Sequence, residues 1–326
     1  MAGIAVTNSK NMMLFSGGAF PELAAEIGEH LGVAPTPTDS YAFANGELFV
    51  RYKESVRGCD AFVVQSMSVP INRWLMETLI MIDALKRGSA KRITVVLPFY
   101  PYARQDKKHR GREPISARLV ADLLRTAGAN RILTVDLHTA QIQGFFDGPV
   151  DHLFAMETLA SYIGEKYEDK PLAVVAPDSG RVRVAERWTD RLGGRPLGFI
   201  HKTRDPLRPN EVVANRVVGD IEGRVCVVVD DMIDTGGTIV RAADLLASAG
   251  AADVVVAATH PIFSEPAVER LAKAPVSEVV VTNTLPLPPG TDLEKLTVLS
   301  VAPLVAKAIY EVFTDGSVTT LFGGLS

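Results

Sequence analysis

The hydrophobic positions of this chain fall into short apolar runs that alternate with segments of helical periodicity. Uninterrupted β-branched and aliphatic runs are typical of strands that are buried on both faces of a parallel sheet. Their alternation with helical segments predicts an α/β fold with mainly parallel sheets. The expected strands lie at 12–15, 62–65, 93–97, 132–135, 172–176, 254–257 and 279–281.

One further run, VCVVV at 225–229, ends in the two carboxylates Asp230 and Asp231. The loop DTGGT at 234–238 follows, and then a helical pattern that Gly250 is expected to stop. The loop offers backbone amides at the positive end of a helix, where a phosphate can bind. The two carboxylates can accept hydrogen bonds from vicinal hydroxyls. A phosphate beside a diol describes a ribose 5-phosphate.

A tight turn with a capped helix is the alternative interpretation of this loop, because glycine pairs and threonine caps are common. The acids favour a ligand site, since open parallel sheets bind ligands at the carboxyl ends of their strands. The expected sugar-phosphate ligands are Asp230, Asp231, Asp234, Thr235, Gly236, Gly237 and Thr238.

The chain also contains an internal repeat. An ungapped alignment places 117–138 on 239–260, and both segments contain ADLL, an alanine–glycine–alanine stop and a final histidine. A duplicated domain is the simplest account, and it predicts one domain over 1–155 and a second over 156–326. Only the second copy carries DDMIDTGGT, whereas the basic stretch YARQDKKHRGREPIS precedes the repeated helix in the first.

Composition narrows the class of protein. The 326 residues include 34 Lys and Arg against 38 Asp and Glu, a net charge of −4, so we expect neither a nucleic-acid nor a membrane partner. The two cysteines, Cys59 and Cys226, are too few for a disulfide framework, which favours a reduced, cytoplasmic setting. No apolar run approaches the length that spans a membrane.

The basic segment RQDKKHRGR at 104–112 lies between an expected strand and an expected helix. Such a run is most often a solvated loop and less often a nucleic-acid patch. A third interpretation is a mobile loop that closes over phosphates, because polyanionic substrates need local cations in a chain that is acidic overall.

Two other segments place polar groups at alternate positions. In FANGELFV, Phe43, Asn45 and Glu47 would share one face if the segment is extended, whereas a turn that enters an edge strand is the alternative. In LGFIHKTRD, Lys202 and Arg204 would share one face of a strand. Both are common surface residues, but two cations held in this way could neutralise a diphosphoryl group during transfer.

Two further positions could take part in binding phosphate or metal. The strand at 172–176 leads into a glycine turn with Asp178, Ser179 and Gly180, a second candidate phosphate or metal corner. His138 follows another expected strand, but histidine is a poor first choice for Mg²⁺, which prefers oxygen. His260 occupies the same place in the repeat, which hints at a shared structural role.

These motifs, in this order, resemble those of the ribose-phosphate diphosphokinases, or phosphoribosyl-diphosphate synthetases, of the phosphate-activated, bacterial class I type. The resemblance runs from about Met12 to Phe322 and implies two tandem domains of the type I phosphoribosyltransferase fold, each with a mainly parallel sheet flanked by helices. It implies transfer of the β,γ-diphosphoryl group of MgATP to the anomeric hydroxyl of ribose 5-phosphate. The products would be phosphoribosyl diphosphate and AMP, for nucleotide biosynthesis, and the sequence names no general base.

The resemblance also implies roles for individual residues. Lys202 and Arg204 would be catalytic, 107–112 would form a flexible catalytic loop, and Arg204 would join the ribose 5-phosphate ligands. Metal would lie near His138 and Asp178. Arg181 departs from the family pattern, in which a second glycine is usual, and this cation could itself meet a phosphate. The implied ATP contacts are Phe43, Asn45, Gly46, Glu47, Arg104 and Gln105.

Assembly and regulation are implied in the same way. The family is generally homohexameric, and its positions linked to phosphate and ADP fall on Ser55, Arg57, Gln143, Asp151, Ser317 and Thr319. Ala140 and His152 stand where serine and asparagine occur in some relatives, which gives the hypothesis of a weakened regulatory response. Two alternatives stay open: a phosphoribosyltransferase that uses the same loop without an ATP site, and a non-catalytic regulatory homologue.

Overall fold

The structure is a computed structural model that describes the backbone of residues 10–205 and 208–322, with the side chains in these ranges except those of 202–215. The chain forms two compact units. The first takes the residues up to Leu153 together with those from Ala302 onward, and the second takes Phe154–Val301. None of the described helices is long and apolar enough to cross a membrane.

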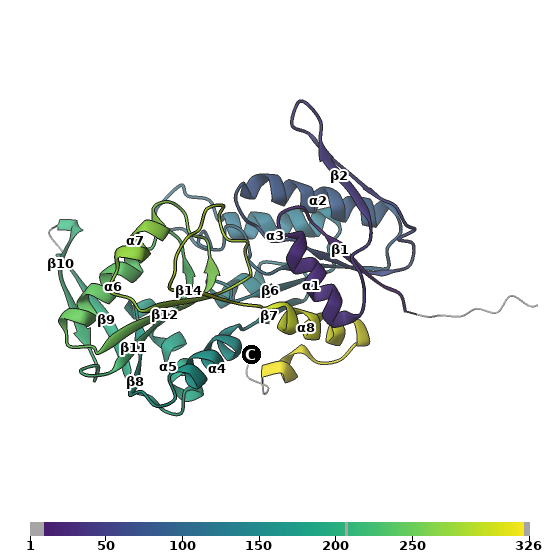
Figure 1. Ribbon diagram of the computed structural model, residues 1–326. Helices are drawn as coiled ribbons and strands as arrows, with labels where there is room; N and C mark the ends of the chain where they lie inside the picture. The colour runs from purple at the N-terminus through teal and green to yellow at the C-terminus, as the bar shows by residue number, and fades with distance from the viewer. Residues whose placement is uncertain (1–9, 206–207, 323–326) are drawn as a thin grey trace, which may run out of the picture. The chain divides into compact units, whose positions relative to one another are not determined.

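The first unit is built on a parallel sheet in the order β1-β4-β5-β6-β7. Helices α2 and α3 lie together on one side of this sheet, and α1 and α8 lie side by side on the other (Figure 1). A separate antiparallel pair, β2 and β3, projects from the unit (Figure 1). The elements are β1 (Met12–Ser16), α1 (Pro21–Leu31), β2 (Thr38–Ala42), β3 (Leu48–Tyr52), β4 (Asp60–Val64), α2 (Ile71–Arg87), β5 (Arg92–Leu97), α3 (Ser116–Ala127), β6 (Arg131–Val135), the 3₁₀ helix η1 (Ala140–Gly144), β7 (Val150–Leu153), α8 (Ala302–Thr314) and the 3₁₀ helix η3 (Val318–Phe322).

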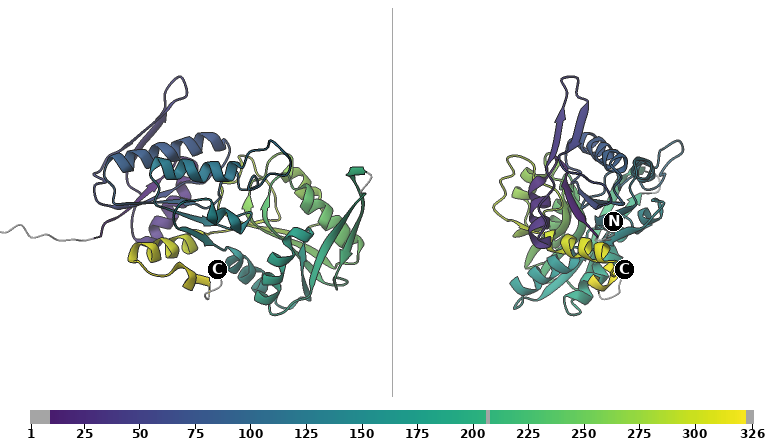
Figure 2. Two further views of the ribbon diagram at one scale, coloured as in Figure 1. Left: turned by 180° about the vertical axis from the view of Figure 1, so that it is seen from behind. Right: turned by 90° about the vertical axis from the view of Figure 1, so that its right-hand side faces the viewer.

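The second unit has a larger sheet in the order β10-β9-β8-β11-β12-β13-β14. All its pairs are parallel except the long β9–β10 pair at one edge, which is seen from behind in Figure 2. Helices α6 and α7 cover one face, and α4 and α5 cover the other. The elements are α4 (Met156–Lys166), β8 (Leu172–Ala176), the 3₁₀ helix η2 (Ser179–Arg181), α5 (Val182–Arg191), β9 (Leu197–Asp205), β10 (Arg208–Val218), β11 (Val225–Ile233), α6 (Gly237–Ser248), β12 (Asp253–Pro261), α7 (Ala267–Lys273), β13 (Glu278–Thr282) and β14 (Leu296–Leu299).

This architecture confirms the predicted α/β class with mainly parallel sheets, and each predicted apolar run lies in a strand except for Gln65, which follows the end of β4. The runs are buried because helices cover both faces of each sheet, so neither face needs polar residues. The repeat also has a structural counterpart. In each unit an amphipathic helix, α3 or α6, is followed by a glycine with positive φ, Gly128 or Gly250, and then by a strand, β6 or β12.

The last helix lies elsewhere than the predicted division places it. The predicted second domain, 156–326, includes 302–326, but the structure groups the residues from Ala302 onward with the first unit. Helix α8 packs against α1, and beyond its end Arg92 joins Asp60 to Asp315 through hydrogen bonds of 2.7–2.9 Å. Helical periodicity reveals that α8 buries one face, but it does not reveal which partner covers that face.

Strand β11 is longer than its apolar run. It continues through Asp230 and Asp231 to Ile233, because β12 also extends beyond its apolar run and pairs with it as far as Ile233↔Pro261. Strand β8, on the other side, pairs only with 225–228. The two acids therefore lie beyond the part of β11 that pairs with β8, and Val229 separates them from the last paired residue, Val228.

Candidate active site

The loop 234–238 forms the entry to α6 in the second unit. Gly236 is the N-cap of this helix and has φ 73°, a left-handed conformation that glycine adopts at little cost. The first amides of a helix have no intrahelical partner and lie at its positive end, so the loop has the local geometry of a phosphate site. Arg270 of α7 lies beside the loop, and its Nη1 donates to the Thr235 carbonyl at 3.0 Å. Sequence reasoning missed Arg270, because no local motif links it to the loop.

The two acids of β11 are shielded from solvent and paired with a cation. The Asp230 side chain is 15% exposed and that of Asp231 is 8% exposed. Arg181 lies at the start of α5, and its Nε is 3.1 Å from Asp230 Oδ1 while its Nη2 donates to Asp231 Oδ1. The backbone amide of Asp231 also donates to Asp230 Oδ1, at 2.9 Å. Burial and then the neighbouring Asp231 charge raise the pKa of Asp230, whereas the Arg181 guanidinium acts in the opposite direction.

The corner after β8 is a capped turn. Asp178 is the N-cap of η2, and its Oδ1 accepts a hydrogen bond of 2.9 Å from the Gly180 amide. The Asp178 side chain is half-buried, and Arg181, three residues later, directs its guanidinium to the acids of β11. Arg181, which belongs to the predicted phosphate corner, thus forms ion pairs with the acids of the predicted sugar site.

The two expected catalytic cations lie on β9, as the strand prediction requires. The backbone of Lys202 pairs with Asn215, and that of Arg204 pairs with Val212. The side chains of Lys202 and Arg204 lie outside the described part of the structure, so their expected roles remain predictions.

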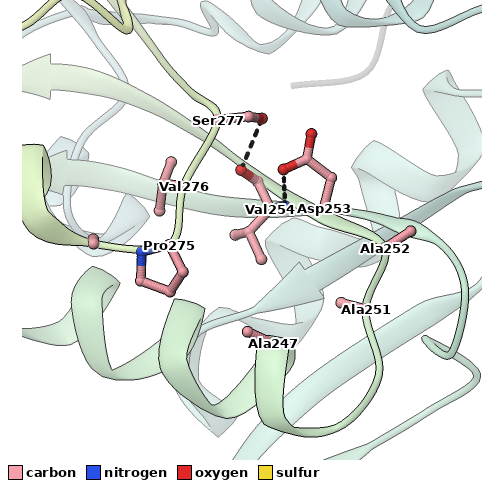
Figure 3. Close-up of a pocket in the computed structure, with 9 residues that line it drawn as sticks. Ala247, Ala251, Ala252, Asp253, Val254, Pro275, Val276 and Ser277 are labelled. Atoms are coloured by element: carbon pink, nitrogen blue, oxygen red, sulfur yellow. Dashed lines mark hydrogen bonds between the residues drawn. The ribbon is translucent and has the colours of Figure 1, made fainter.

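A hollow of about 350 Å³ lies at the other end of the strands of this sheet, where β12 begins (Figure 3). It is lined by the end of α6, the start of β12 and the segment before β13. Its two polar side chains are turned to local backbone: Ser277 Oγ donates to the Val254 carbonyl at 3.2 Å, and Asp253 Oδ1 accepts from the Val254 amide at 2.7 Å (Figure 3). Because its lining is mostly alanine, valine and proline, this hollow lacks the polar groups that bind a phosphorylated sugar.

In the first unit, the segment FANGE is not extended. Phe43 to Glu47 form the turn of the β2–β3 hairpin, in which the Phe43 amide donates to the Glu47 carbonyl at 2.8 Å and Gly46 has φ 90°. The prediction of one shared face therefore rested on the wrong backbone conformation, and the alternative of a turn is correct. Asn45 Oδ1 accepts from the Glu47 amide at 3.2 Å, and the Phe43 ring is 48% exposed.

The basic segment forms an irregular loop between β5 and α3. Arg104 and Gln105 are exposed, and Gln105 Oε1 accepts a hydrogen bond of 2.6 Å from the Ser116 hydroxyl. Asp106, in contrast, is buried, and its Oδ2 accepts hydrogen bonds from Thr139 and Gln141. This anchor, which sequence reasoning missed, ties the start of the loop to the turn after β6.

Further along the loop, residues 107–112 are all exposed to solvent. Glu113 Oε2 accepts hydrogen bonds from the backbone amides of His109 and Arg110 at 2.7 and 2.9 Å. Both hydrogen bonds lower the pKa of the Glu113 carboxyl, and the one from Arg110 has the larger effect. The charged side chains of the loop are therefore presented to solvent on a backbone that Glu113 holds.

The comparisons with known proteins cover almost the whole chain. Residues 12–128 match the family model for the N-terminal domain of ribose phosphate pyrophosphokinase, and residues 199–323 match that for the phosphoribosyl synthetase-associated domain. A ribose-phosphate pyrophosphokinase of Mycobacterium tuberculosis is 66% identical over 319 residues, which is 97% of each chain. The chain belongs to the ribose-phosphate pyrophosphokinase family.

Two further relatives support this assignment. A ribose-phosphate pyrophosphokinase of Streptomyces coelicolor is 63% identical over 322 residues, 99% of each chain. The crystal structure of phosphoribosylpyrophosphate synthetase from Mycobacterium smegmatis is 64% identical, with a TM-score of 0.90, and the match covers 94% of this chain and 100% of that one. This chain therefore shares its fold with that synthetase.

His138, one of the two predicted metal residues, has different surroundings from its counterpart in the repeat, His260. His138 is half-buried in the bend after β6, whereas its repeat counterpart His260 is buried within β12, with Nδ1 2.9 Å from the Thr284 hydroxyl. The two histidines therefore differ in backbone setting and in burial. Among the described residues, no group of three or more His, Cys, Asp or Glu side chains could hold a metal ion.

The expected regulatory positions all lie in the first unit. Ser55 and Arg57 are exposed, and Asp151 is 2.6 Å from Arg131. The hydroxyls of Ser317 and Thr319 are 2.9 Å apart. Two other residues make local hydrogen bonds: Gln143 Nε2 in η1 donates to the Ala140 carbonyl at 3.2 Å, and His152 Nε2 in β7 accepts from the Leu137 amide at 2.8 Å.

Proposed function

We propose that this chain is a ribose-phosphate diphosphokinase, which converts MgATP and ribose 5-phosphate to phosphoribosyl diphosphate and AMP. The observation that carries the proposal is the corner at the carboxyl end of β11. It combines a glycine loop at the start of α6 with a buried acid pair, Asp230 and Asp231. In this interpretation the loop 234–238 holds the 5-phosphate, and the acids accept hydrogen bonds from the ribose hydroxyls.

The reaction forms one bond and breaks one. The oxygen of the anomeric hydroxyl bonds to the β-phosphorus of ATP, and the bond from that phosphorus to the oxygen that bridges to the α-phosphorus breaks. AMP leaves with the bridging oxygen, and the hydroxyl proton is lost. Because no covalent enzyme intermediate is needed, the contribution of the protein is positioning and charge balance. We assign charge balance to Lys202, Arg204 and the basic loop that begins at Arg104.

We place the ATP contacts in the first unit, at Phe43, Asn45, Gly46, Glu47, Arg104 and Gln105. Support comes from the exposed Phe43 ring, which is available for stacking on a base. Support also comes from the cationic loop, which Asp106 and Glu113 hold at its two ends.

We further propose Mg²⁺ as the cofactor. When bound with ATP, Mg²⁺ supplies positive charge to the phosphate oxygens. Asp178 fits this ion because it offers carboxylate oxygen. Among the described residues no group of side chains could surround a metal ion by itself, which is compatible with Mg²⁺, since this ion is commonly shared between one or two carboxylates, water and phosphates. His138 fits less well, because its ring offers nitrogen. A cytoplasmic homohexamer whose regulatory positions respond to phosphate and ADP is the assembly that we propose.

The test is product analysis of the purified chain with MgATP and ribose 5-phosphate, with and without inorganic phosphate. The expected result is AMP and phosphoribosyl diphosphate in equal amounts. If neither forms under either condition while ribose 5-phosphate still binds, the proposal is wrong and a regulatory homologue is favoured. A steep, normal activation by phosphate would remove the hypothesis that Ala140 and His152 weaken regulation.

A further inference from the structure

Arg181 links the two candidate phosphate corners of the second unit. Its guanidinium contacts Asp230 through Nε and Asp231 through Nη2, so a single side chain bridges two consecutive carboxylates. All three side chains are 8–15% exposed. Ion pairs that are shielded in this way are stronger than surface pairs, and removal of one partner leaves uncompensated charge behind.

The need for such a cation follows from the acids themselves. Two adjacent buried carboxylates repel one another, and burial disfavours the charged form of each. A carboxylate that takes up a proton becomes a donor at that oxygen and loses part of its capacity to accept hydrogen bonds. A fixed positive charge close to the pair therefore favours recognition of a diol, because it favours the ionised form of both acids.

Resting on the function proposed above, we propose that Arg181 is a positioning residue for ribose recognition. Its guanidinium keeps Asp230 and Asp231 paired and oriented so that they accept hydrogen bonds from the vicinal hydroxyls of ribose 5-phosphate. Arg181 thus acts on the sugar through the acids, and the planar fork of arginine suits this task because it reaches two carboxylates at once.

The sugar itself supplies a specific test. 2-Deoxyribose 5-phosphate retains the phosphate and lacks one of the two vicinal hydroxyls, so the preference for ribose over deoxyribose measures recognition of the diol. A variant that merely loosens the fold should weaken both sugars alike. A variant that disturbs the acid pair should weaken ribose 5-phosphate more than its deoxy analogue.

The variants are Arg181→Gln, which removes the charge at similar length, and Arg181→Lys, which keeps a charge that reaches one carboxylate. Arg183→Gln is the matched control, because Arg183 is exposed on the same helix. We expect Arg181→Gln to raise the KM for ribose 5-phosphate and to lower the ribose preference, each by about tenfold, a typical effect of losing one charged hydrogen bond. The KM for ATP and kcat should stay within about threefold, Arg181→Lys should lose about threefold in preference, and Arg183→Gln should match the original chain.

An unchanged ribose preference in Arg181→Gln, or an equal loss for both sugars, would overturn the proposal. A fall in kcat at constant KM would also overturn it, since Arg181 would then act on the diphosphoryl group. If Arg181→Gln does not fold, Arg181→Lys decides, and an unchanged preference there is the negative result. Calorimetric titration with both sugars makes the same comparison without turnover. A chain that binds ribose 5-phosphate with a diol preference that depends on Arg181, but forms no AMP, would refute the proposed function and leave this inference standing.

Discussion

Two adjacent glycines of the phosphate loop are expected to respond in opposite directions to the same substitution. Gly236 has φ 73° and caps α6, whereas Gly237 is the first residue of that helix. A Cβ built on either glycine would meet its nearest neighbour, Ala267 or Arg270, at 3.5 Å, an ordinary contact. The effect of an added methyl group therefore depends on backbone conformation and not on crowding.

The magnitude follows from that conformation. A left-handed residue other than glycine costs about 1–2 kcal/mol, and the smaller freedom of the unfolded chain returns about 0.4–1 kcal/mol. Gly236→Ala should therefore lower the free energy of unfolding by about 1 kcal/mol. Gly237→Ala should raise it by about 0.5–1 kcal/mol, because alanine is favoured over glycine in a helix.

Binding should separate the two variants further. If the loop relaxes in Gly236→Ala, ribose 5-phosphate must restore the strained conformation when it binds. That strain costs about 1–2 kcal/mol, which corresponds to an increase of roughly 5–30-fold in KM. Gly237→Ala keeps the cap conformation, so the strain that raises the KM in Gly236→Ala is absent from it. Denaturant unfolding and initial rates at varied ribose 5-phosphate measure both quantities. Stability changes of the same sign, or an unaltered KM in Gly236→Ala, would refute the reasoning.

Two further predictions concern buried acids outside the sugar site. Asp106→Ala removes the acceptor of the hydrogen bonds from Thr139 and Gln141, so we expect a loss of about 1–3 kcal/mol in unfolding free energy. We also expect a higher KM for ATP and an unchanged KM for ribose 5-phosphate. Initial rates with each substrate varied in turn will check this. Burial by itself raises the pKa of Glu278, but hydrogen bonds to its carboxylate outweigh this effect and lower the pKa to about 2. The donors, in order of decreasing effect, are Lys166, Thr297, Tyr162 and Tyr167. This group therefore contributes stability above its ordinary pKa of 4.5, and the contribution is lost as the pH falls from about 4.5 through about 2. Glu278→Gln should unfold more easily at pH 7 and show a shallower loss of stability in acid, as denaturant titrations across this pH range will measure.

Each of these two predictions has an outcome that contradicts it. Equal changes in both KM values for Asp106→Ala would indicate a general loss of structure and not a local anchor for the ATP segment; Asp122→Ala, an exposed acid of the following helix, is the control. For Glu278→Gln, an acid dependence as steep as that of the original chain would show that other carboxylates dominate acid unfolding.

The sequence by itself determined the features that depend on neighbouring residues. Apolar runs predict the strands because burial on both faces of a sheet acts on consecutive positions. The order of strand, acids, glycines and helix at 225–248 predicts the phosphate corner because a helix N-terminus and a glycine turn are local structures. The internal repeat predicts two similar units, and the motifs in order identify the family.

Only the tertiary structure decided which distant residues meet. Arg181 and Asp231 are 50 residues apart, and their pairing depends on the adjacency of β8 and β11, which no local pattern specifies. Asp106 finds its donors 33 and 35 residues away. Helix α8 joins the first unit for the same kind of reason, since an amphipathic pattern defines a buried face without naming its partner. Short-range periodicity thus fixes the elements, while the packing of elements that are far apart in the sequence brings together the charges of the candidate site.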